Sequence, residues 1–186
     1  MVAAFALLAL PALSARAADF TFSGTLAPTG VALYSLNVAT SPFTLVTLST
    51  TSYASGGFDP VLSLFRGTDG LLLDANDDVN ALVPLSVVPA DPITGERFDS
   101  YFEFDLEPGS YTLALTYSPN YAAGPNLSNG FAPTGPFDSS AGRTGSFTVG
   151  IQNVTGAAVV PEPGTVALLA AGALPLAGRL RRRHRA

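Results

Sequence analysis

An acidic run in the middle of the chain contains the residue types that bind calcium. Asp74, Asn76 and Asp78 occupy alternate positions, and alternating oxygen ligands also begin the calcium loop of an EF-hand. The rest of that loop is missing, because Val79 stands where glycine is needed and Leu85 where a bidentate glutamate is needed. The spacing excludes an EF-hand but allows a calcium site built from oxygen ligands in β-sheet loops.

Further acidic residues are expected at the same end of the fold. If successive strands run antiparallel, every second connection lies at one end, and the aspartates in those connections come close together. Their repulsion would favour a divalent cation, and the candidate ligands are Asp59, Asp74, Asn76, Asp77, Asp78 and Asp99. The alternative, which we favour, is that these aspartates only cap turns by accepting hydrogen bonds from backbone N–H groups. No cofactor is required by the sequence, and calcium is the ion that these residues could bind.

The composition excludes several kinds of catalysis. Cysteine is absent, and the one histidine, His184, lies in the C-terminal tail. Thiol catalysis and thiolate metal sites are therefore excluded, and the commonest general base is missing from the rest of the chain. No phosphate loop, Gly-x-Ser-x-Gly motif or distinct carboxylate pair for glycoside hydrolysis occurs. We expect no enzymatic activity.

The region between the two ends of the chain is strongly acidic. From Asp19 to Val160 it contains three arginines, no lysine and thirteen acidic residues, which gives a net charge of −10. A domain with this charge repels nucleic acid and anionic membrane surfaces. We therefore expect no nucleic-acid partner.

Alternating apolar and polar residues predict the strands that must position the acidic residues. Phe20, Phe22 and Leu26 share one face of the first such segment, which indicates a half-buried strand. Similar segments recur to Ile151 between turns rich in glycine and proline, with no amphipathic helix among them. The sequence predicts an all-β fold, an antiparallel β-sandwich of about eight strands with jelly-roll-like character.

A long loop at 118–142 carries aromatic residues that could bind a ligand. Tyr117, Tyr121, Phe131 and Phe137 lie in or beside it and could form a stacking platform for sugars or for a partner protein. The alternative, which we favour, is that they fold back as a lid on the sheet edge.

Both ends of the chain carry an apolar segment, so a hydrophobic helix is expected at each terminus. Residues 1–18 combine an apolar run with small residues suited to cleavage, which is typical of a signal peptide. The apolar segment Thr165–Gly178 would be about 21 Å long as a helix, against about 30 Å for the hydrocarbon core of a bilayer. It is a poor permanent transmembrane helix. The arginines that follow it should stay on the cytoplasmic side: Arg179, Arg181, Arg182, Arg183 and Arg185.

The C-terminal segment resembles a PEP-CTERM sorting signal. The resemblance lies in Val160, Pro161, Glu162, Pro163 and Gly164, followed by the apolar segment and the arginine cluster. In that family an exosortase, a membrane protease-transpeptidase, recognises the signal and removes it during export. The resemblance implies a chain that is anchored transiently in the inner membrane and is then sorted to the cell surface or released. It places the sorting signal at 161–186, after a linker at 154–160 and a β-sandwich domain at 19–153.

The domain resembles the exported β-sandwich domains related to bacterial pre-peptidase C-terminal domains. The resemblance lies in four short motifs in order: Gly57–Phe65, Asn76–Asp78, Asp99–Tyr101 and Pro108–Leu113. It implies an accessory or binding domain without established enzymatic activity, and some relatives bind calcium. We therefore expect a non-catalytic protein of the cell surface or extracellular matrix. The alternative is a carbohydrate- or matrix-binding module that contacts extracellular polysaccharide and that calcium could stabilise.

Overall fold

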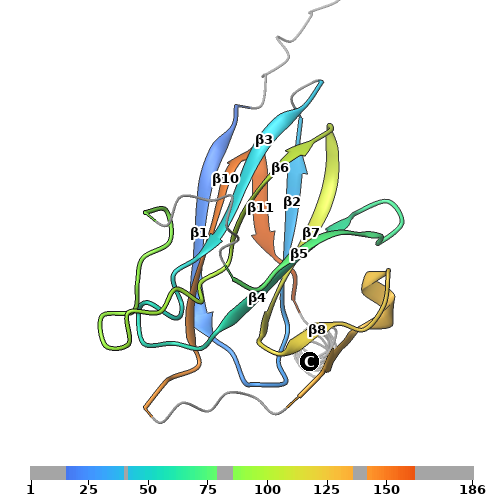
Figure 1. Ribbon diagram of the computed structural model, residues 1–186. Helices are drawn as coiled ribbons and strands as arrows, with labels where there is room; N and C mark the ends of the chain where they lie inside the picture. The colour runs from blue at the N-terminus through green and yellow to red at the C-terminus, as the bar shows by residue number, and fades with distance from the viewer. Residues whose placement is uncertain (1–15, 40–41, 79–85, 136–141, 162–186) are drawn as a thin grey trace, which may run out of the picture.

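The computed structural model describes residues 16–39, 42–78, 86–135 and 142–161 (Figure 1). This part of the chain forms eleven strands and one 3₁₀ turn, η1 (Leu127–Asn129). The strands are β1 (Ala18–Thr25), β2 (Ala32–Val38), β3 (Thr44–Thr50), β4 (Pro60–Arg66), β5 (Leu72–Asn76), β6 (Tyr101–Leu106), β7 (Gly109–Tyr117), β8 (Asn120–Ala122), β9 (Phe131–Pro133), β10 (Ser146–Val154) and β11 (Gly156–Val159).

The strands form two large sheets and one small ribbon, and every strand pair within them is antiparallel. One sheet has the order β1-β10-β3-β6 and the other has the order β11-β2-β7-β4-β5. β8 and β9 pair only with each other. The expectation of an all-β, antiparallel fold is confirmed.

The core lies between the two large sheets, which pack face to face as a sandwich (Figure 1). Leu36, Leu64 and Leu113 come from the five-stranded sheet, while Leu48 and Ile151 come from the other, and all five are fully buried. Alternation explains most of this burial, since residues two apart on a strand face the same side. β4 is the exception: all its residues except Arg66 are buried, because Leu62 and Leu64 face the core while Phe65 on the other face packs against Phe131 of β9. A continuous apolar run is typical of such a central strand.

Three of the eleven strands were not predicted from the sequence, which indicated about eight. β8 and β9 lie within the long loop, where segments of three residues are too short to show a periodic pattern. β11 falls in the segment expected to be a linker. It pairs with β2, with Gly156 opposite Asn37 at one end and Val159 opposite Tyr34 at the other. Glycine and alanine are poor strand formers, so pairing with β2 rather than local preference holds this strand in place.

The expected terminal helices lie outside the described residues. Within the residues that are described, no helix is long and apolar enough to cross a membrane.

Candidate functional site

Asp99 is fully buried just before β6, where its carboxylate holds a turn of the chain. One oxygen accepts hydrogen bonds from Thr50 Oγ1 at 2.8 Å and from the Tyr53 N–H at 3.0 Å, and the other accepts from the Ala54 N–H at 2.8 Å. Both carboxylate oxygens are therefore occupied by donors from the protein. This arrangement agrees with the capped-turn alternative for Asp99.

Ser100 continues the network around Asp99. Its N–H donates to Thr50 Oγ1 at 2.9 Å, and its hydroxyl lies 2.6 Å from the carbonyl oxygen of Pro60 and 2.9 Å from those of Asn76 and Asp77. The segment 99–100 thus connects the start of β4, the end of β5 and the turn after β3. These hydrogen bonds hold the backbone next to Asp59 and at Asp77 in place.

Two of the candidate ligands, Asp59 and Asp77, interact with Tyr121, and a third, Asp78, interacts with Asp77. Asp77 Oδ2 accepts hydrogen bonds from the Tyr121 hydroxyl and from Ser118 Oγ, the latter at 3.3 Å. Burial raises the pKa of Tyr121, and the hydrogen bond to Asp77 and the charges of Asp77 and Asp59 raise it further. Burial and the charge of Asp77 also raise the pKa of Asp78. These interactions relate Asp59 and Asp77 to Tyr121 and relate Asp78 to Asp77, and convergence of the three carboxylates on one ion stays a prediction.

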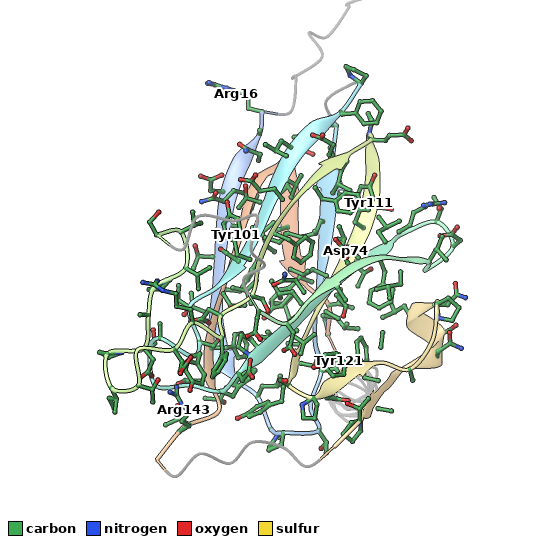
Figure 2. The ribbon with its side chains drawn as sticks, in the orientation of Figure 1. Arg16, Asp74, Tyr101, Tyr111, Tyr121 and Arg143 are labelled. Carbon is green, nitrogen blue, oxygen red and sulfur yellow. The ribbon has the colours of Figure 1, made fainter. Side chains whose placement is uncertain are left out.

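The remaining two candidates have local hydrogen bonds of their own. Asp74 is exposed on β5, and its Oδ1 accepts from the Ala75 N–H at 2.8 Å (Figure 2). Asn76 Oδ1 accepts from the Tyr101 N–H at 3.0 Å and so connects β5 to β6. Asp74 and Asn76 therefore each have one side-chain oxygen engaged by a backbone N–H group.

The fit of this acidic group to a metal ion is incomplete. Among the residues that the structure describes, no three histidine, cysteine or acidic side chains are placed to hold a metal ion together. One observation favours a ligand: Asp77 Oδ1 is buried and has no hydrogen-bond partner within the described part of the chain. Calcium binding at this end of the sandwich stays a prediction.

If calcium binds there, it should raise the melting temperature more than magnesium or sodium at matched ionic strength. Binding to the folded chain alone stabilises by about 2.7 kcal/mol at a hundredfold excess over Kd, which corresponds to several degrees. Magnesium is a suitable control because it requires near-octahedral geometry and loses water reluctantly. Asp77→Asn combined with Asp78→Asn should abolish the calcium-specific shift. Equal shifts from all three salts would rule out the site.

An ion pair between Asp91 and Arg143 was not predicted from the sequence. Arg143 Nη2 lies 2.7 Å from Asp91 Oδ2, and the guanidinium lies 3.3 Å above the Tyr53 ring (Figure 2). Hydrogen bonds from the Thr94 N–H, the Arg143 side chain and the Ile93 N–H lower the pKa of Asp91 to about 2, although burial acts in the opposite direction. Thirteen acidic residues could have paired with Arg143, and no sequence signal selects Asp91 among them.

The described aromatic residues of the long loop take part in packing. Tyr117 stacks on Phe58 with ring centroids 3.7 Å apart, and Phe131 meets Phe65 edge to face at 6.1 Å. The Tyr121 hydroxyl bonds to Asp77, and Phe137 lies outside the described residues. These contacts agree with a lid on the sheet edge rather than with a free stacking platform.

A cavity of about 550 Å³ lies at the other end of β4, between the edge strands β5 and β6. Asp59 precedes β4 and Arg66 ends it, so the acidic group and the cavity are separated by the length of that strand. Figure 2 shows Tyr111 toward one end of the sandwich and Arg143 toward the other. Burial and the nearby Glu107 charge raise the pKa of Tyr111, against a smaller opposing effect of Arg66. The side chains that give the cavity its chemistry are Phe43, Arg66, Phe104, Asp105, Glu107 and Tyr111.

The described chain ends where the expected sorting motif begins. The Val160 N–H donates to the Leu33 carbonyl oxygen at 2.8 Å, directly after β11. Val160 and Pro161 are described and exposed, while Glu162, Pro163, Gly164 and the arginine cluster lie outside the described residues. The motif therefore begins at the edge of the five-stranded sheet.

Comparisons with known proteins identify the C-terminal segment. The PEP-CTERM protein-sorting motif matches residues 159–185. The chain carries a PEP-CTERM sorting motif, which implies recognition by an exosortase and export to the cell surface or extracellular space.

One solved structure similar to this chain is the pre-peptidase C-terminal domain of a collagenase from Bacillus anthracis. The two are 14% identical, with a TM-score of 0.40, and the match covers 72% of this chain and 87% of that one. No curated protein matches the chain. The resemblance of the C-terminal segment to a PEP-CTERM sorting signal is confirmed.

Proposed function

We propose that this chain is a non-catalytic exported protein, which an exosortase-type system sorts to the cell surface or extracellular matrix. The observation that carries the proposal is the sorting motif at 159–185, which follows directly on the last strand of the sandwich. The order of the segments gives each a role. The sandwich is the part displayed, and the tail is the part recognised and removed.

The chemistry of the tail supports a temporary membrane anchor. The arginine cluster stays on the cytoplasmic side, since cationic residues after an apolar segment resist translocation. The sequence at the motif contains Pro161 and Pro163, a residue type that disfavours a helix, and a non-helical segment would suit recognition by a protease. An apolar segment about 21 Å long is short for a span of about 30 Å, which suits an anchor that is later removed.

A non-catalytic role agrees with the residues available. The chain has no cysteine, and its one histidine is in the tail that would be removed. Asp99 is engaged in holding a turn, and Asp91 is paired with Arg143. Neither buried carboxylate is presented to a substrate.

We expect Glu162→Ala combined with Pro163→Ala to prevent processing in a host that contains an exosortase. The full-length chain should be cleaved near the motif and reach the surface, whereas the substituted chain should keep its tail and stay with the inner membrane. Fractionation with intact-mass measurement of the C-terminus distinguishes the two outcomes.

Ile93→Ala is the matched control for this experiment. Ile93 is 89% exposed and lies in the β-sandwich domain, outside the motif in the sequence, so its substitution should change neither processing nor location. The proposal fails if a chain lacking residues 161–186 reaches the surface as efficiently as the intact chain. It also fails if the substituted chain is processed normally.

The alternative function, carbohydrate or matrix binding through the long loop, stays a prediction. The described rings of that loop are engaged in packing, so they do not by themselves favour it.

A further inference from the structure

The cavity between β5 and β6 combines aromatic surface with hydrogen-bonding groups. Phe43 is 55% exposed at its rim, while Phe104 and Tyr111 line it from β6 and β7. The Tyr111 hydroxyl donates to the Glu107 carbonyl oxygen at 2.7 Å, which fixes the orientation of the ring. Its volume of about 550 Å³ falls within the usual range of small-molecule sites, about 300–1,000 Å³.

The charges around the cavity disfavour an anionic ligand. Arg66 is the one cation among the lining residues, and it already pairs with Asp69 at 3.3 Å. Asp105 and Glu107 are exposed on the β6–β7 side and contribute two carboxylates. The cavity therefore presents acceptors for O–H and N–H donors and repels acidic groups.

The edge of β6 disfavours an added peptide strand. Glu103 and Asp105 point outward on this edge strand, and Glu107 and Pro108 follow its end. Charged side chains and proline on an edge strand discourage pairing with another chain. A ligand that binds by stacking and by side-chain hydrogen bonds suits this cavity better than one that binds by main-chain pairing.

We propose that the cavity between β5 and β6 binds a short saccharide that carries no acidic groups. The apolar face of a sugar ring would stack on the exposed ring of Phe43, and its hydroxyl groups would donate to the carboxylates of Asp105 and Glu107. None of the residues that line this site belongs to the aromatic long loop, although that loop bonds to the neighbouring β4–β5 hairpin through Pro125 and Leu127. It does not depend on the sorting proposal, because binding is measured on the purified protein.

The test is calorimetric titration of the purified full-length protein with three oligosaccharides of similar length: cellotetraose, the glucosamine tetramer and tetragalacturonate. Saturable binding of cellotetraose and the glucosamine tetramer, without binding of tetragalacturonate, is expected. Phe43→Ala should weaken binding about tenfold, which is the loss of roughly 1.4 kcal/mol expected for one stacking contact. Asp105→Asn combined with Glu107→Gln should weaken it by a similar factor.

Leu45→Ala is the matched control, because Leu45 is 48% exposed on β3 near Phe43 but does not line the cavity. It should leave the affinity unchanged, and thermal melting of each variant checks that the fold is retained. The proposal is overturned if no oligosaccharide binds. It is also overturned if Phe43→Ala binds the oligosaccharides normally. Tetralysine is an added control for charge: if it binds, and the glucosamine tetramer is the only oligosaccharide that binds, the cavity attracts positive charge alone and the proposal is overturned.

Discussion

Asp99→Ala should lower the free energy of unfolding by about 4 kcal/mol, because it leaves three donors without their acceptor. Thr50 Oγ1, the Tyr53 N–H and the Ala54 N–H all donate to this carboxylate, which is completely buried. Hydrogen bonds to a charged group contribute about 1.5–3 kcal/mol each, and an unpaired buried donor costs about 1–3 kcal/mol. Urea unfolding of the purified protein measures the change.

The matched control for Asp99→Ala is Asp105→Ala, which removes an exposed carboxylate from the neighbouring strand β6. Exposed substitutions of this kind usually change stability by less than about 0.5 kcal/mol. A difference of under 1 kcal/mol between the two variants would contradict the role assigned to the Asp99 network. An unchanged m-value would show that the comparison concerns the same unfolding reaction.

Features that depend on a single strand were predictable from the sequence. The alternation of Phe102, Phe104 and Leu106 identifies the inward face of β6, and Phe102 and Leu106 are indeed buried. The apolar run from Val61 to Phe65 identifies a central strand. Both signals, the alternation in β6 and the apolar run in β4, lie within a few consecutive residues and are visible locally.

Features that join distant segments were not predictable. Asp91 and Arg143 are 52 positions apart, and nothing local to either residue marks the other as its partner. β11 has small residues without strand preference, and it exists because β2 offers an edge to pair with. The cavity likewise needs residues from β4, β6 and β7 together, so only the arrangement of the sheets reveals it.

The candidate acidic ligands show what strand connectivity can predict and what it cannot. Antiparallel connectivity predicts that Asp59, Asp77 and Asp78 lie at one end of the sandwich, and the charges of Asp59 and Asp77 both act on Tyr121. It could not show that the carboxylate of Asp99 is turned toward the backbone at 53–54 instead of toward the other aspartates. The topology fixes the end of the fold at which a side chain lies, whereas its direction depends on which donors surround it.

Gly57→Ala should destabilise the protein on the order of 3 kcal/mol, because the added methyl group meets backbone atoms that cannot move aside. A Cβ atom at this position would lie 2.7 Å from the Ser52 carbonyl oxygen and closer still to the Ser146 carbonyl oxygen. Ser146 begins β10 and pairs with Thr25 of β1, so relieving the clash would displace a paired strand. The Gly57 N–H also donates to the Ser52 carbonyl oxygen at 2.7 Å, which holds the glycine in place.

Substitutions at two other glycines, Gly56 and Gly135, distinguish the steric clash at Gly57 from the other energetic costs of replacing glycine. At Gly56 a Cβ atom would meet nothing within 4 Å, but the φ of +80° is unfavourable for alanine, so Gly56→Ala should cost about 1 kcal/mol. At Gly135 the nearest atom would be Pro119 Cγ at 3.7 Å, an ordinary contact, and Gly135→Ala should change stability by less than about 0.5 kcal/mol. Urea unfolding should therefore rank the losses as Gly57 above Gly56 above Gly135. If Gly57→Ala proved no more destabilising than Gly56→Ala, the close packing of the turn after β3 against β10 would not be a source of stability.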